Sequence, residues 1–276
     1  MLIFTVILLT VIILAVIYVF LVMPRVADAS DMDLQSSDYA HRGLHSASIP
    51  ENSLKAFLLA KENGYGIEFD VRLSKDGEIF VFHDETLTRM CSLNKRLSEM
   101  TAFEISQINL NGSSEKIPRL SEVLSLIDGT VPILIEIKHS PEQYKLCKQL
   151  CELMDTYNGA FSVQSFDPNI LSYFKKYRPR FARGQLVTKI SKGGTYSVDS
   201  RLKNPFVRFA LTHMLTNVIS RPDFISIDGK LINEPAFLLA TFLFRAKGFV
   251  FTVKNSKQYA MCRKRSLYVI FENIKP

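Results

Sequence analysis

After residue 38 the chain alternates short apolar runs with amphipathic stretches, and this alternation constrains the fold more than any other feature. Helical stretches separate most of the runs, at residues 53–63, 141–157, 169–176, 234–247 and 256–264. Repeated β-then-α units form a parallel sheet, and eight of them can close into a barrel. The sequence therefore predicts an α/β fold, a TIM-like (β/α)8 barrel, whose eight strands lie at residues 39–41, 66–71, 131–137, 161–164, 181–187, 224–228, 248–253 and 267–271.

A small hairpin is expected after the second strand. Residues 72–82 contain two apolar runs joined by Ser74-Lys75-Asp76-Gly77, and Asp-Gly is a favoured hairpin turn. The alternative architecture is an open doubly wound sheet, which usually carries a glycine-rich phosphate loop. The chain has no such loop, so the barrel is favoured.

The N-terminus differs in kind from the rest. Leu2 to Met23 is an uncharged run of 22 residues, which as a helix would rise about 33 Å and cross a bilayer core. A cleaved secretory signal is one alternative, because Ala27-Asp28-Ala29 resembles a cleavage site, and a buried core helix is another. No Lys or Arg precedes the run, and it is longer than the usual apolar core of a signal. We therefore expect a retained transmembrane helix, with secretion after cleavage less favoured.

The expected organisation has three parts: a transmembrane anchor at residues 1–24, a polar linker at residues 25–38 and a barrel domain at residues 39–276. Four Asp and three Ser lie between residues 26 and 38, which is typical of a linker. Arg25 is the only cation close to the apolar run, so the sequence leaves the side of the membrane open.

Composition limits the classes of partner. Hydrophobic residues make up 47% and charged residues 22%, which supports a full core and excludes disorder. The net charge of +7 suits anionic partners or an evenly basic surface. Lys and Arg form no stripe interleaved with aromatic residues, so we expect no nucleic acid, and no protein partner is predicted.

The four cysteines form no CxxC pair and are interpreted as ordinary thiols: Cys91, Cys147, Cys151 and Cys262.

Three carboxylates end apolar runs in the first half of the chain. Glu68 and Asp70 are two residues apart, and alternate residues of a strand face the same side. Glu136 would arrive from the next strand of the barrel. Three oxygen ligands with room for water suit Ca²⁺ or Mg²⁺. The alternative is that each carboxylate pairs with a nearby Lys or Arg.

Two histidines and two cations accompany these acids. His41 and His83 can move protons near neutral pH, so one can donate while the other accepts. Arg42 and Lys138 can hold a phosphate, or can pair with the metal-binding carboxylates. Glu51 could contact the metal-bound water or the substrate, and either Asn52 or Ser53 could cap the following helix. The remaining histidines are expected to be structural or peripheral: His45, His139 and His213.

In order and spacing, five motifs resemble the glycerophosphodiester phosphodiesterase family, and the resemblance covers residues 39–276. The motifs are His41-Arg42-Gly43, Pro50-Glu51-Asn52-Ser53, Glu68-Phe69-Asp70-Val71, Asp76-Gly77 followed by Phe82-His83-Asp84, and Glu136-Ile137-Lys138. The resemblance implies a metal-dependent enzyme that hydrolyses glycerophosphodiesters to glycerol 3-phosphate and an alcohol. Carried over residue by residue, it implies Glu68, Asp70 and Glu136 as ligands of a divalent cation, Ca²⁺ or Mg²⁺. It also implies His41 and His83 as the acid–base pair, and Arg42 and Lys138 as phosphate-binding residues.

The departures from the family pattern lie around the substrate's head group. The family often has Trp-Thr-Val-Asn where this chain has Phe251-Thr252-Val253-Lys254, and an Asp where this chain has Glu272-Asn273. Two other functions stay open: a phospholipase D-type cut of lysophospholipids in the membrane, and a non-catalytic membrane-tethered binding module. Residues 204–219 carry an apolar stripe at helical spacing, which could lie on a bilayer or pack onto the barrel.

Overall fold

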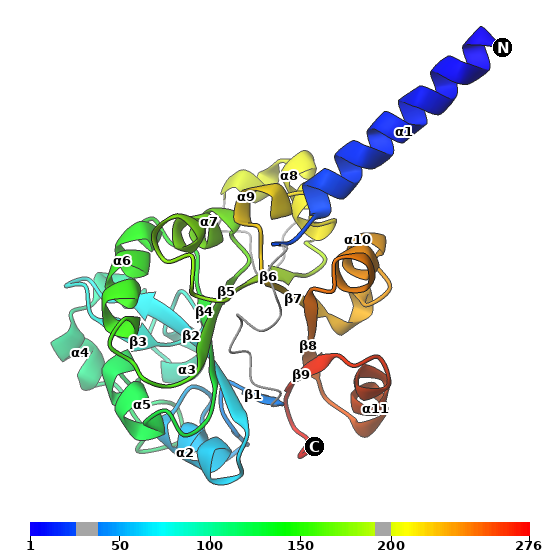
Figure 1. Ribbon diagram of the computed structural model, residues 1–276. Helices are drawn as coiled ribbons and strands as arrows, with labels where there is room; N and C mark the ends of the chain where they lie inside the picture. The colour runs from blue at the N-terminus through cyan, green and yellow to red at the C-terminus, as the bar shows by residue number, and fades with distance from the viewer. Residues whose placement is uncertain (26–37, 191–199) are drawn as a thin grey trace.

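The sheet closes into a barrel of eight parallel strands in a computed structural model that describes residues 1–25, 38–190 and 200–276 (Figure 1). Neighbouring strands pair in chain order, and β1 also pairs with both β2 and the last strand, β9. The predicted TIM-like barrel is therefore confirmed. Its parallel strands are β1 (Tyr39–His41), β2 (Gly66–Leu73), β4 (Ile133–Ile137), β5 (Phe161–Ser165), β6 (Arg183–Val187), β7 (Phe224–Asp228), β8 (Lys247–Val253) and β9 (Tyr268–Phe271).

The expected hairpin follows the second strand. β3 (Ile79–Val81) runs antiparallel to the end of β2, and Gly77 has a φ of +94° in the connecting turn. Between β3 and the next barrel helix, the chain builds a small hydrophobic cluster of its own, which includes Phe82, Leu97 and Ile105. This segment carries three short helices: α3 (Thr88–Cys91), η2 (Leu97–Glu99) and α4 (Ala102–Ser106).

Helices surround the strands, and most agree with the sequence pattern (Figure 1). Ser53 is the N-cap of α2 (Leu54–Glu62), because its hydroxyl accepts a hydrogen bond from the amide of Ala56. The helices at predicted positions are α6 (Gln143–Met154), α7 (Pro168–Tyr177) and α11 (Ser256–Lys264), and the structure adds α5 (Leu120–Ile127), η3 (Ser200–Lys203) and η4 (Gly229–Leu231).

Two predicted helices differ from the sequence pattern. The stretch 204–219 divides into α8 (Pro205–Thr212) and α9 (Asn217–Ser220), because Met214 between them has a φ of +57°. The stretch 234–247 is helical without a break from α10 (Pro235–Leu238) into the π-helix η5 (Leu239–Leu243), but it ends early, before Arg245 at a φ of +55°. A left-handed residue cannot continue a right-handed helix, so each apolar stripe is shorter than the sequence pattern suggests.

The barrel interior is apolar at one end and polar at the other. Tyr39, Phe224 and Phe249 are buried together in a cluster, and the Phe224 and Phe249 ring centroids are 5.0 Å apart. Gly184 on β6 makes room for Phe224, since a Cβ there would collide with the Phe224 ring. Ser226 is two residues after Phe224 and faces the same side of β7. The aromatic layer therefore closes one end of the barrel, and polar side chains follow it towards the strands' carboxyl ends.

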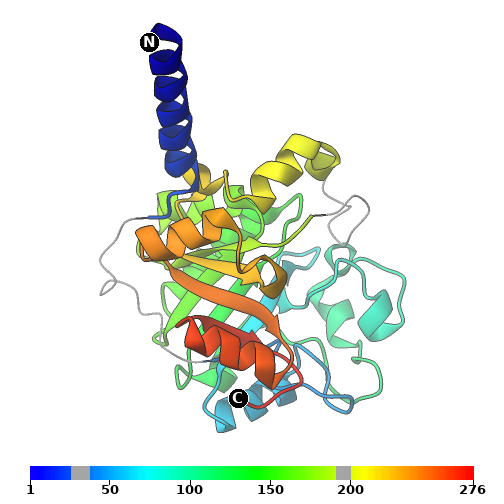
Figure 2. The same cartoon turned by 90° about the vertical axis from the view of Figure 1, so that its right-hand side faces the viewer.

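The N-terminal apolar run forms a single helix, α1 (Leu2–Val22), that projects from the barrel (Figures 1 and 2). It is long and apolar enough to cross a membrane, with a mean hydropathy of 3.1. Its last turn is attached to the barrel: the side-chain amide of Asn217 donates to the carbonyl of Val22 at 2.8 Å, and Arg221 donates to those of Phe20 and Met23. The linker expected at residues 25–38 lies mostly outside the described residues.

Substitution of Phe224 tests how much the aromatic layer contributes to stability. We expect Phe224→Ala to lower the free energy of unfolding by about 3–5 kcal/mol, because the fully buried ring leaves a cavity that its neighbours cannot fill. Thermal and urea unfolding of the full chain would measure the loss. The control is Phe103→Ala, since Phe103 is 74% exposed and its removal should change stability by less than about 0.5 kcal/mol. Equal losses in the two variants would contradict this description of the core.

Candidate active site

Three carboxylates converge on two adjacent strands, with Glu68 and Asp70 inside β2 and Glu136 one residue before the end of β4. Glu68 and Asp70 face the same side of β2, and Glu136 is the register partner of Asp70 on β4. Their side-chain oxygens lie within 4.8 Å of one another, and all three residues are buried. The structure thus brings together the three acids that the sequence analysis singled out.

Positive charge only partly compensates this cluster. The Lys138 ammonium lies 2.8 Å from Oδ1 of Asp70 and also contacts Oε1 of Glu136, while the Arg42 guanidinium is 3.5 Å from Asp70. Burial raises the pKa of Glu68 well above its ordinary value, and the nearby charges of Asp70 and Glu136 raise it further. Burial acts in the same direction on Asp70, but Lys138, His83 and Arg42 outweigh it and hold its pKa well below the usual range.

The donor set fits a hard divalent cation. All three candidate ligands are carboxylates, the atoms that Ca²⁺ and Mg²⁺ prefer, and no sulfur or imidazole belongs to this described group. Burial raises the pKa of Glu68 most, and the charges of Asp70 and Glu136 raise it further against the opposing effect of Arg42 and Lys138. A bound cation would supply the missing positive charge, and Lys138 would then no longer be needed between Asp70 and Glu136.

Neighbouring amides and hydroxyls orient the carboxylates. The side-chain amide of Asn52 donates to Asp70 at 2.9 Å, and that of Gln164 donates to Glu68 at 3.3 Å. Ser226 in turn donates to the Gln164 side chain at 2.8 Å. The sequence analysis offered Asn52 only as a helix cap and assigned no role to Gln164 or Ser226. The sequence signals that could have indicated these roles were the location of Gln164 and Ser226 in predicted strands and of Asn52 in the Pro-Glu-Asn-Ser segment.

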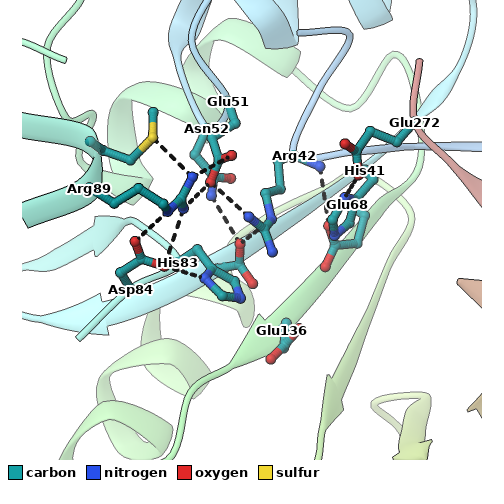
Figure 3. A network of polar contacts seen from close by, with 12 residues as sticks. His41, Arg42, Glu51, Asn52, Glu68, His83, Asp84, Arg89, Glu136 and Glu272 are labelled. Carbon is teal, nitrogen blue, oxygen red and sulfur yellow. Dashed lines mark hydrogen bonds and ion pairs between the residues drawn. The ribbon is translucent and has the colours of Figure 1, made fainter. Parts of the chain in front are cut away.

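His41 is held by a carboxylate from the last strand. It ends β1, and its Nδ1 lies 3.1 Å from Oε2 of Glu272, which follows β9 (Figure 3). Lys254 is 3.2 Å from the same Glu272 oxygen. Burial lowers the pKa of His41 to about 4, although the hydrogen bond to Glu272 opposes this shift. His41 is thus neutral at neutral pH, and the contact with Glu272 leaves its Nε2 for a reacting group.

His83 is held in the same way by Asp84. Its Nδ1 lies 2.6 Å from Oδ1 of Asp84, and Arg89 binds the other Asp84 oxygen at 2.7 Å. Arg89 also binds Glu51, whose Oε1 accepts from Arg42 at 2.7 Å (Figure 3). A continuous polar chain therefore runs from His83 to Arg42. Arg89 was not anticipated, because it contacts Glu51 from 38 residues away in sequence.

The loop after β1 places Arg42 at the cluster. Arg42 and Gly43 both have positive φ, +57° and +80°, and a Cβ at Gly43 would lie 2.9 Å from Ala56 in α2. The turn therefore requires glycine and brings α2 against the strand end. The backbone amide of Arg42 donates to Glu68 at 3.2 Å, so the turn also positions a carboxylate.

The remaining histidines occupy different surroundings. His139 binds Asp167 at 3.0 Å, and His213 binds Glu234 at 2.5 Å. His45 lies close to His41 and Glu272, with ring nitrogens and carboxylate oxygen within 4.8 Å of one another. Burial lowers the pKa of His45. It therefore lies at the border of the site.

Comparison with known proteins agrees with this arrangement. A glycerophosphodiester phosphodiesterase of Caldanaerobacter subterraneus subsp. tengcongensis is 35% identical over 158 residues, which cover 53% of this chain and 65% of that protein. The chain thus matches less than two thirds of the length of these relatives. The crystal structure of a glycerophosphodiester phosphodiesterase from Thermotoga maritima superimposes with a TM-score of 0.66 at 26% identity, covering 86% of this chain and 95% of that one.

A second structure supports the fold. An Oleispira antarctica phosphodiesterase, solved in complex with the product sn-glycerol-3-phosphate, has a TM-score of 0.66 at 21% identity and covers 84% of this chain and 91% of that one. The model of the Glycerophosphoryl diester phosphodiesterase family matches residues 41–270, from His41 at the end of β1 to Ile270 in β9. Because this match includes most of the barrel and all three clustered carboxylates, the chain belongs to the glycerophosphoryl diester phosphodiesterase family.

Proposed function

We propose that this protein is a metal-dependent phosphodiesterase that hydrolyses glycerophosphodiesters to glycerol 3-phosphate and an alcohol. One observation carries the proposal: two histidines, each bound at Nδ1 by a carboxylate, belong to the same site as three converging buried acids. That inventory suits phosphodiester cleavage. The names of the relatives and the glycerol 3-phosphate bound to the Oleispira enzyme support the same substrate class.

Glu68, Asp70 and Glu136 would hold the divalent cation, Ca²⁺ or Mg²⁺. When bound, such a cation polarises the phosphoryl oxygens and stabilises the charge that develops on them. Lys138 is then free to leave its two carboxylates and contact a phosphate oxygen. Arg42 can present its planar guanidinium to two oxygens at once, and its ion pair with Glu51 fixes the orientation of that plane. Glu51, next to Arg42, would contact the glycerol end of the substrate.

The histidines would exchange the protons of the reaction. One Nε2 removes the proton from the attacking hydroxyl, whether of water or of the substrate's own glycerol, and the other Nε2 gives a proton to the departing alcohol oxygen. Glu272 and Asp84 accept the Nδ1 protons, so they select the tautomer in which Nε2 can accept. Burial keeps the ring of His41 neutral, so its Nε2 is able to accept a proton.

A lysophospholipid is the second candidate substrate. It contains the same glycerophosphodiester linkage, and α8 exposes the apolar rings of Phe206 and Phe209, which could contact acyl chains. We further propose that α1 is retained as a transmembrane anchor, which would keep the site near lipid. The anchor, the linker and the barrel would then be the chain's three parts.

The two histidines can be tested separately. We expect His41→Ala and His83→Ala each to lower kcat by about 10²–10⁴-fold on glycerophosphocholine, because each removes one proton-transfer step. The control is His213→Ala, since His213 pairs with Glu234 and plays no part in the proposed chemistry. Full turnover by either variant, with an unchanged thermal midpoint, would refute the assignment.

Metal dependence is tested by binding as well as by activity. We expect chelation to abolish turnover and Ca²⁺ or Mg²⁺ to restore it. Calorimetric titration should show binding to the wild type that Glu68→Gln and Asp70→Asn lose, because each removes a charged ligand. Glu78→Gln changes an exposed acid outside the site and should bind normally. Turnover that is indifferent to chelation would exclude the metal from the mechanism.

Membrane insertion of α1 is a separate prediction. We expect the full chain to stay in the membrane fraction at alkaline pH with its N-terminus intact by mass. The double variant Ile12→Arg, Ile13→Arg should be released, because each Arg at the middle of a spanning helix costs about 2.5–3.5 kcal/mol. A mature chain that lacks the first residues would instead identify a cleaved signal.

A further inference from the structure

We propose that the side of the barrel around the foot of α1 is itself a bilayer-contact surface, on which α8 and η5 lie in the lipid headgroup region. This inference rests on the proposed transmembrane anchor and goes beyond it, since an anchor alone could hold the barrel at any distance from the lipid. The surface consists of exposed apolar side chains, which we call the apolar collar: Phe206, Phe209, Ile219, Leu238, Phe242 and Leu243.

The aromatic side chains of the collar are exposed to solvent and do not pack on the barrel. Phe242 is 90% exposed and Phe206 is 81% exposed, and neither ring belongs to a described hydrophobic cluster. Exposed aromatic side chains in water are unfavourable by roughly 25 cal/mol per Å² of apolar surface. Contiguous apolar surface of this kind marks a binding face, and Phe at the end of a short amphipathic helix suits the bilayer interface.

The composition of these segments differs from that of four other barrel helices, whereas α5 resembles them in having one charged residue, Glu122. Together α8, α9, α10 and η5 contain one charged residue, Arg208, and no carboxylate. Arg208 donates to the carbonyls of Leu202 and Lys203, at 2.6 and 3.1 Å. By contrast, α2, α6, α7 and α11 each carry two or more Lys or Arg, as expected of helices that face water. Transfer of a surface that carries no carboxylate from water to lipid has a small desolvation cost.

The attachment of α1 fixes the collar at the membrane. Asn217 in α9 binds the last turn of α1, and the Arg221 guanidinium lies 4.6 Å from the centre of the Phe20 ring. Arg25 pairs with Asp223 at 3.2 Å, so the residues directly after the helix are also held. Figures 1 and 2 show α8 on the same side of the barrel as the foot of α1. A bilayer crossed by α1 therefore reaches the barrel where the collar lies.

The two halves of the collar are linked, and they border the catalytic end. His213, directly after α8, binds Glu234, directly before α10, at 2.5 Å. The Thr212 hydroxyl in α8 reaches the carbonyl of Thr188 at 3.5 Å, and Thr188 follows the carboxyl end of β6. The foot of α1 is held next to the amino end of β7, where Arg25 binds the carbonyl of Pro222 and the carboxylate of Asp223. The collar therefore extends along the side of the barrel, from the amino end of β7 to the carboxyl end of β6.

The absence of tryptophan from the chain gives a direct test. Phe206→Trp and Phe242→Trp each create a single fluorophore in the collar of the full-length protein. In nanodiscs of phosphatidylcholine we expect blue-shifted emission, and brominated acyl chains should remove most of it. Phe103→Trp is the matched control, because Phe103 is also an exposed ring, 74% accessible, but lies in α4 outside the collar. Its emission should stay red-shifted and unquenched.

A fourth variant separates the collar from the anchor. Phe4→Trp places the fluorophore in α1, so its quenching reports insertion of the helix alone. Quenching at position 4 without quenching at 206 and 242 would overturn the collar while leaving the anchor intact. A blue shift at 206 or 242 without quenching would mean that protein, such as a second copy of the chain, covers the surface, and this too would overturn it. No quenching at any position would reject both proposals.

Discussion

The structure depends on a buried excess of negative charge and on how it is held. Three carboxylates stand close together on two adjacent strands, and burial makes their mutual repulsion costly. Lys138 and Arg42 offset part of it, and amide donors from Asn52 and Gln164 fix the oxygens in place. Burial, and after it the charges of Asp70 and Glu136, raises the pKa of Glu68. An arrangement of this kind is stable only because the barrel imposes it, and it is the arrangement that a divalent cation would complete.

The two histidines show how one fold can present two similar groups in different surroundings. Each uses Nδ1 to bind a carboxylate, but Glu272 also pairs with Lys254, whereas Asp84 belongs to the chain through Arg89 and Glu51 to Arg42. The orientation of His83 is thus coupled to that of a phosphate-binding candidate. His41 is coupled instead to Glu272, which follows the last strand, and through it to Lys254, which follows β8. The candidate proton-transfer and phosphate-binding residues on the His83 side are therefore connected through shared side chains.

The sequence predicted the strands and the acids well, because both depend on local pattern. Buried parallel strands are nearly continuous apolar runs, as in Ile133–Ile137, and an acid that ends such a run must lie at the sheet edge. The hydrogen-bond partners of these residues could not be predicted from the sequence. Gln164 binds Glu68 from 96 residues away and Arg89 binds Glu51 from 38 residues away, and nothing local signals either contact. The interruptions at Met214 and Arg245 were missed because neither residue type usually adopts positive φ.

The contact between His41 and Glu272 joins positions 231 residues apart, on the first and last strands of the barrel. One member is made at the start of the domain and the other within a few residues of the chain's end. A ribosome-bound or prematurely terminated chain could contain every proposed metal ligand and still lack the carboxylate that holds this imidazole. The orientation of His41 would then be completed only when the last strand joins the first, so that closure of the barrel and assembly of the candidate site are one event.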